Sequence, residues 1–87
     1  ELPVIAKSES FFKVYPNPST GKFTLELSEI ASSVTVEIYG IMGEQILRQE
    51  VSGFTIYEFD LSTQARGIYI VRVLNGDKME IQRVVKQ

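Results

Sequence analysis

The sequence contains no cysteine, no histidine and no tryptophan among its 87 residues. Without cysteine the chain has no disulfide, no thiolate nucleophile and no zinc–thiolate centre. Without histidine it lacks the commonest general base and the commonest transition-metal ligand. These absences exclude triad hydrolysis and imidazole-based metal chemistry. We therefore expect no cofactor, no bound metal and no enzymatic activity of the chain itself.

The sequence also lacks a strong excess of charge of either sign and lacks long hydrophobic runs. Nine basic and eleven acidic residues give a net charge of -2, and neither sign is clustered along the chain. A nucleic-acid-binding domain normally carries a basic face, so we predict no nucleic-acid partner. No apolar run approaches the length of about 18 residues that a membrane helix needs, so we predict no membrane span.

The length suits one small domain, and 44% of the residues are hydrophobic. A chain of this size can bury enough surface for a single core. The first residues are irregular and become polar, so we assign 1–10 to a linker or leader and 11–87 to the folded domain. The chain opens on Glu1 without a signal-peptide pattern. We therefore expect a piece of a longer precursor.

Strand-like alternation of apolar and polar residues runs through most of the chain, and no segment has a helical period. Alternation fails at Ile46 and Leu47, which indicates a bulge or an edge position. Residues 68–74 are apolar on nearly both faces, which predicts a central strand covered from two sides. Turn signals about every 8 to 12 residues favour an all-β, immunoglobulin-like sandwich of two antiparallel sheets. We predict seven strands over 11–15, 22–27, 34–39, 44–51, 56–61, 68–74 and 78–85.

Glycine, proline and asparagine mark the turns. Gly40 and Gly43 stand three apart and predict a turn, because glycine permits a positive φ where other residues would be strained. Asn75-Gly76 predicts a type I′ hairpin turn. The segment 16–21 predicts a turn that only ends the first strand, because its two prolines cannot donate to a ladder and its glycine frees the bend.

Acidic residues are the only candidate metal ligands in this chain. Most of the carboxylates fall on outward positions of the predicted strands, where a solvated sheet face explains them. Asp60, Asp77 and Glu80 leave a calcium site open as a less favoured hypothesis, because the spacing of a calcium-binding loop is absent.

Three segments in order resemble the C-terminal sorting domain of proteins exported by the type IX (Por) secretion system of Bacteroidetes. They read VYPNPSTGKFTLEL, VEIYGIMGEQIL and FDLSTQARGIYIVRVLNGDKMEIQRVVKQ, and the resemblance runs from about Phe11 to Gln87. Two positions depart from the family pattern: Gly40 replaces an aspartate, and Arg83 stands where a lysine is common. The resemblance assigns the sorting-signal motif to Tyr15, Pro16, Asn17, Pro18, Gly21, Gly43, Asp60, Leu61, Ser62, Gly67, Tyr69, Arg83, Val84, Val85 and Lys86.

The resemblance implies a sorting signal that directs a larger cargo across the outer membrane. Its implied partners are the outer-membrane translocon, shuttle proteins and a sortase-like peptidase of the type IX machinery, together with an upstream cargo domain in the same precursor. It also implies transit through the periplasm, removal of the domain, possible attachment of the cargo to anionic lipopolysaccharide, and a secreted or cell-surface destination.

Two other interpretations remain open from the residues alone. One is an adhesin-like or carbohydrate-binding module whose site combines Tyr15, Tyr39 and the loop around Asn17. The other is a structural spacer of fibronectin-III type. For the sorting interpretation, we expect the last strand to be a free edge that offers backbone groups to a receptor, with Arg83 and Lys86 supplying charge.

Overall fold

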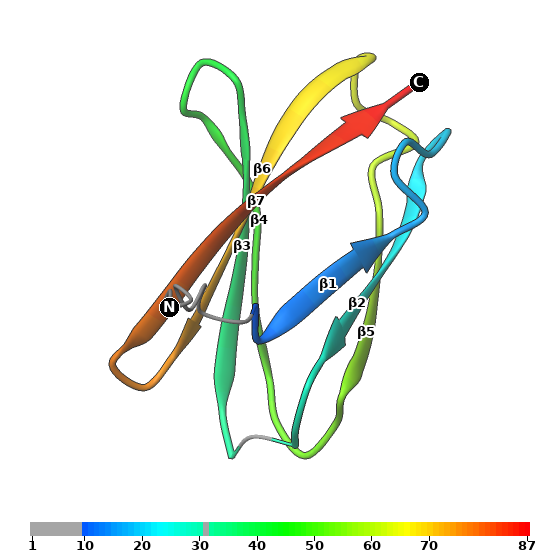
Figure 1. The fold of residues 1–87 in the computed structure, drawn as a ribbon. Coiled ribbons are helices and arrows are strands. Elements are labelled where there is room, and N and C mark those ends of the chain that lie inside the picture. The colour runs from blue at the N-terminus through cyan, green and yellow to red at the C-terminus, as the bar shows by residue number, and fades with distance from the viewer. Residues whose placement is uncertain (1–9, 31) are drawn as a thin grey trace, which may run out of the picture.

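The computed structural model describes residues 10–30 and 32–87, so nearly all of the predicted leader lies outside the described residues. The described residues form seven strands and no helix (Figure 1). The strands are β1 (Phe12–Tyr15), β2 (Lys22–Leu27), β3 (Val34–Gly40), β4 (Gln45–Val51), β5 (Ile56–Asp60), β6 (Gly67–Asn75) and β7 (Lys78–Lys86).

The strands build two antiparallel sheets that face each other (Figure 1). One sheet has three strands in the order β1-β2-β5, and the other has four in the order β4-β3-β6-β7. This division, with sequential strands passing between the sheets, is that of an immunoglobulin-like sandwich. The predicted fold class and the number of strands are confirmed.

The core lies between the two inner faces. Phe23 and Phe59 are register partners on β2 and β5, and their rings stack with centroids 5.2 Å apart. In β2, β3 and β6 the core side chains occupy every second position, because successive side chains of a strand point to opposite faces. The buried hydrophobic residues are Phe12, Phe23, Leu25, Leu27, Val34, Val36, Ile38, Val51, Phe59, Leu61, Tyr69, Val71, Val73 and Val84.

The irregularity predicted in the fourth strand is confirmed. Ile38 pairs with Leu47, but the next residue, Tyr39, pairs with Gln45, so Ile46 is the extra residue of a bulge. The strand also lies at one edge of its sheet. A bulge on an edge strand disfavours pairing with another chain.

Two of the predicted turns differ in detail. Only Gly43 has a positive φ, 91°, in the β3–β4 turn, whereas Gly40 ends β3 in ordinary strand geometry. In the β6–β7 turn Gly76 has a φ of 65°, and neither Asn75 nor Asp77 has a positive φ. Because Gly76 is the first central residue between paired Asn75 and Lys78, the turn has the φ pattern of type II′, and the predicted type I′ is wrong.

The prediction for residues 68–74 is half right. β6 is central, since it pairs with both β3 and β7. Tyr69, Val71 and Val73 are buried on its inner face, but Ile70 and Leu74 on its outer face are only half-buried. The run is therefore covered from one side, and its second apolar face remains partly open.

Candidate recognition site

Motif segments that are far apart in sequence meet at one end of the sandwich. The loop after β1, the turn after β5, the start of β6 and the end of β7 lie together there (Figure 1). We call this region the C-terminal corner. It comprises residues 15–21, 60–62, 67–69 and 83–87.

Asn17 attaches the loop to the last strand through its side chain. Its Nδ2 donates to the Arg83 carbonyl at 3.1 Å, and its Oδ1 accepts from the Val85 N–H at 2.9 Å. One amide side chain thus occupies an acceptor and a donor on the edge of β7, as a neighbouring strand would. The peptide bonds preceding Pro16 and Pro18, on either side of Asn17, are both cis.

Ser19 continues the attachment through its backbone. Its N–H donates to the Val85 carbonyl at 3.0 Å, and its carbonyl accepts from the Gln87 N–H at 2.8 Å. These bonds form a parallel bridge between Ser19 and Lys86. The Ser19 side chain is buried, donates to the Lys22 carbonyl at 2.6 Å and accepts from the Gly21 N–H at 3.1 Å. Ser19 was not among the predicted motif residues, because its partners lie far along the chain.

The edge of β7 is therefore closed over its last residues, and the predicted free edge is wrong there. Farther back, Glu80 accepts from the Phe11 N–H at 2.9 Å, and Gln82 donates to the Phe12 carbonyl at 2.7 Å. Residues 10–19 thus run along this edge and connect the two sheets. The segment predicted to end a strand also holds the last strand in place.

Gly21 packs directly against the turn after β5. Its carbonyl accepts from the Leu61 N–H at 2.8 Å. A Cβ added at Gly21 would lie 2.8 Å from Ser62 Cβ and 2.9 Å from Ser62 Cα. Gly21 has no positive φ, so this glycine is required by close approach and not by a bend, contrary to the prediction.

Asp60 fixes the turn that Gly21 contacts. Its carboxylate accepts from the Ser62 N–H at 2.8 Å, and Leu61 between them is buried in the core. The hydrogen bonds from Ser62 lower the pKa of Asp60, and the nearby ammonium groups of Lys22 and Lys86 lower it further. Asp60, in the third motif segment, therefore remains ionised and interacts electrostatically with Lys22 of the first segment.

Tyr69 anchors the start of β6. Its hydroxyl donates to the Ala65 carbonyl at 2.5 Å, and its ring is buried beside Val84, its register partner. A tyrosine at this place, bonded back to the preceding connection, is the tyrosine corner of immunoglobulin-like folds. Gly67, opposite Lys86, has a φ of 148°, which favours glycine at this position.

Gly43 is the one predicted motif residue that lies away from the C-terminal corner. It is in the β3–β4 turn, next to the edge strand opposite β7. The adjacent motif residues Val84 and Val85 face opposite ways: Val84 is 0% exposed in the core, and Val85 is 40% exposed on the outer face.

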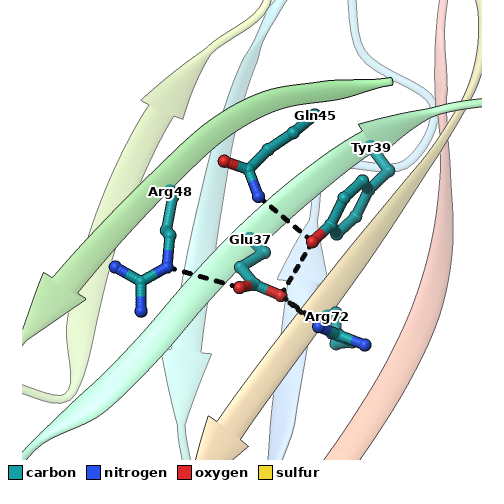
Figure 2. Close-up of polar contacts among 5 residues, drawn as sticks. All are labelled: Glu37, Tyr39, Gln45, Arg48 and Arg72. Carbon is teal, nitrogen blue, oxygen red and sulfur yellow. Dashed lines mark hydrogen bonds and ion pairs between the residues drawn. The ribbon is translucent and has the colours of Figure 1, made fainter. Parts of the chain in front are cut away.

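A second polar arrangement, which the sequence did not reveal, lies on the outer face of the four-stranded sheet (Figure 2). Glu37 is only 7% exposed there. Its carboxylate contacts Arg72 Nη2 at 2.7 Å and Arg48 Nε at 3.4 Å, and it accepts from the Tyr39 hydroxyl at 3.1 Å. Gln45 donates to the same hydroxyl, which completes the group. Cross-strand pairing of Glu37 with Arg48 and Arg72 was the available signal, but it requires the strand register.

These contacts predict an acid sensitivity. Hydrogen bonding from Arg72 lowers the pKa of Glu37 below its ordinary value of 4.5, and burial opposes this only partly. A lowered carboxyl pKa stabilises the fold above the ordinary pKa, and this contribution is lost as the pH falls through the folded value. Unfolding followed by circular dichroism should therefore show stability decreasing below about pH 4.5. The Glu37→Gln variant should show a flatter decrease, and an unchanged pH profile would contradict this assignment.

The structure does not assemble the alternative sites considered from the sequence. Tyr15 lies on the outer face of the three-stranded sheet, and Tyr39 lies on the outer face of the other sheet. Asp60 and Asp77 lie at opposite ends of the sandwich. Within 10–30 and 32–87, no three acidic side chains are grouped to hold a metal, and no helix could cross a membrane.

The fold and the C-terminal corner define a small immunoglobulin-like module in which the loop after the first strand is hydrogen-bonded to the end of the last strand. Residues 13–87 match the family described as secretion system C-terminal sorting domain. The chain belongs to this family. It is a sorting signal of type IX secretion, and its destination is the cell exterior or surface.

Two curated relatives support the assignment. An endo-acting ulvan lyase of Formosa agariphila is 33% identical over 76 residues, which are 85% of this chain and 14% of the lyase. Ulvan lyase NLR42 of Nonlabens ulvanivorans is 30% identical over 69 residues, which are 79% of this chain and 13% of that protein. The chain thus spans about one seventh of the length of these relatives.

Proposed function

We propose that residues 11–87 form the C-terminal sorting domain of a larger exported precursor. We further propose that the motif residues are the part that the type IX machinery recognises. The carrying observation is the family match over residues 13–87. The two ulvan lyases illustrate such a precursor, since the similar region is a small part of each enzyme. The domain itself serves export, and any catalysis belongs to the cargo.

In this proposal the precursor reaches the periplasm, where the domain folds and presents the C-terminal corner. Shuttle proteins and the outer-membrane translocon of the type IX system then recognise it. A sortase-like peptidase removes the domain by cutting before the folded sandwich, and the cargo is released or attached to anionic lipopolysaccharide. The hydrogen bonds of Asn17, Ser19 and Gln82 support a rigid recognition surface, because they fix the N-terminal and C-terminal segments of the domain to each other.

The test is a reporter carrying an N-terminal signal peptide and this 87-residue chain at its C terminus, expressed in a bacterium with a type IX system. We expect the reporter outside the cells, and we expect periplasmic retention when the chain is absent or the translocon is deleted. Removal of Arg83–Gln87 should also cause retention, because it takes away buried Val84 and the partners of Asn17 and Ser19. Retention of the intact fusion in the wild-type strain would overturn the proposed function.

A further inference from the structure

An apolar strip lies on the outer face of β6 and β7. The register pairs on this face are Ile68–Val85, Ile70–Arg83, Arg72–Ile81 and Leu74–Met79, so each pair contributes at least one apolar side chain and two pairs include an arginine. Met79, Ile81 and Val85 are 52%, 51% and 40% exposed. Exposed apolar side chains gathered on one face mark interaction sites in soluble domains. The strip comprises Ile68, Ile70, Leu74, Met79, Ile81 and Val85.

The other half of the same sheet face has a different character. On β3 and β4 the outward positions include Glu37, Tyr39, Gln45 and Arg48, which bond to one another or to Arg72 (Figure 2). These four side chains therefore use polar groups on partners within the sheet. The strip, in contrast, consists mainly of apolar side chains that are half-buried or exposed.

A hollow lies where the strip reaches the C-terminal corner. It is shallow and open to solvent, is lined by Asn17, Ile68, Gln82, Arg83 and Val85, and has a volume of about 620 Å³. Asn17 holds the backbone of both Arg83 and Val85, so these two side chains project from a fixed strand. A preorganised surface loses less conformational entropy when a partner binds.

A basic side chain lies on the strip. Arg83 is the register partner of Ile70 and has the same parity as Met79, Ile81 and Val85, so it projects from the same face. Across residues 10–30 and 32–87, it takes part in no ion pair. The charge pattern therefore favours an occupant that brings a carboxylate next to apolar side chains.

We propose that the strip and Arg83 form the docking surface for a protein of the export machinery that presents apolar side chains beside a carboxylate. This inference rests on the proposed function. Docking is on the sheet face, because Asn17 and Ser19 already occupy the edge of β7 at the C-terminal corner. A second copy of the chain fits less well, since face-to-face stacking would bring the basic groups of both copies to one apolar surface.

The test uses the secreted reporter fusion with substitutions on the strip. We expect Ile81→Ser and Arg83→Glu each to reduce export about tenfold, as the loss of a central contact does. Arg83→Lys should retain most of the export. Two controls match the chemistry elsewhere: Met42→Ser removes a side chain that is 86% exposed in the β3–β4 turn, and Lys13→Glu reverses a charge on the three-stranded sheet. Both controls should export normally.

Further measurements separate the possible outcomes. Thermal unfolding of each purified 87-residue variant should match that of the unmodified chain, and variants that unfold early are replaced by Ile81→Thr and Arg83→Gln. Excess unmodified chain directed to the periplasm should inhibit export of the reporter by competition, whereas the Arg83→Glu chain should not. Normal export of folded strip variants would overturn this inference while leaving the sorting function intact. Self-association in sedimentation velocity that Ile81→Ser abolishes would also overturn it, in favour of a second copy.

Discussion

Replacing Gly21 with alanine will lower the free energy of unfolding by about 2–3 kcal/mol and the midpoint of thermal unfolding by roughly 10–20 °C. The new Cβ would lie 2.9 Å from Ser62 Cα and 3.1 Å from Ser62 N, which are backbone atoms and cannot rotate away. Relief requires a shift of the turn that carries buried Leu61, or loss of the bond between Leu61 N–H and the Gly21 carbonyl. Thermal unfolding followed by circular dichroism measures the change.

Gly43→Ala is the matched control for this prediction. Gly43 has a φ of 91°, but a Cβ there meets nothing within 4 Å. Its substitution costs only the backbone strain of a positive φ, about 1 kcal/mol. If Gly21→Ala proves no more destabilising than Gly43→Ala, close packing of the C-terminal corner is not the reason for the glycine.

Replacing Val84 with aspartate will leave the domain mostly unfolded. Val84 is 0% exposed and belongs to the hydrophobic core, where burying an ionised carboxylate is costly. A loss above about 4–5 kcal/mol is expected for a buried unpaired charge, which is comparable to the whole stability of a small domain. Urea unfolding and the dispersion of the amide NMR spectrum measure the change.

Val85→Asp separates this effect from a general intolerance of charge in the last strand. Val85 is 40% exposed and points to the outer face, so its aspartate remains in water and the domain should stay folded. The two variants differ by one position but face opposite sides of the same sheet. Equal destabilisation by both substitutions would contradict the observed register of β7.

The strands were predictable because their signal is local. Residues 22–27 and 34–39 alternate with a period of two, and one buried face is enough to fix which residues point inward. The bulge at Ile46 was predictable for the same reason, since two adjacent apolar residues break the period. The open outer face of β6 was not, because an apolar run has the same sequence pattern whether one face or both are covered.

The bonds of the C-terminal corner could not be predicted from spacing. The partners of Asn17 lie 66 and 68 residues away, and Asn17 has the composition of an ordinary turn residue. Gly21 illustrates the same limit: a glycine selected by a neighbouring backbone is indistinguishable in sequence from one selected by its φ. In the sequence, Glu37 occupies a polar position of an alternating strand and therefore looks solvent-exposed. Only the pairing of β3 with β4 and β6 shows that it is buried.

The bridge between Ser19 and Lys86 also bears on synthesis. A ribosome makes residues 17–19 long before residues 83–87, so the loop has no partner until translation reaches the last codons of this domain. A chain that stops a few residues early keeps its first strands but cannot complete the C-terminal corner. Under the proposed function, the export machinery would therefore recognise only precursors whose synthesis has reached residues 83–87, and prematurely terminated precursors would stay in the periplasm.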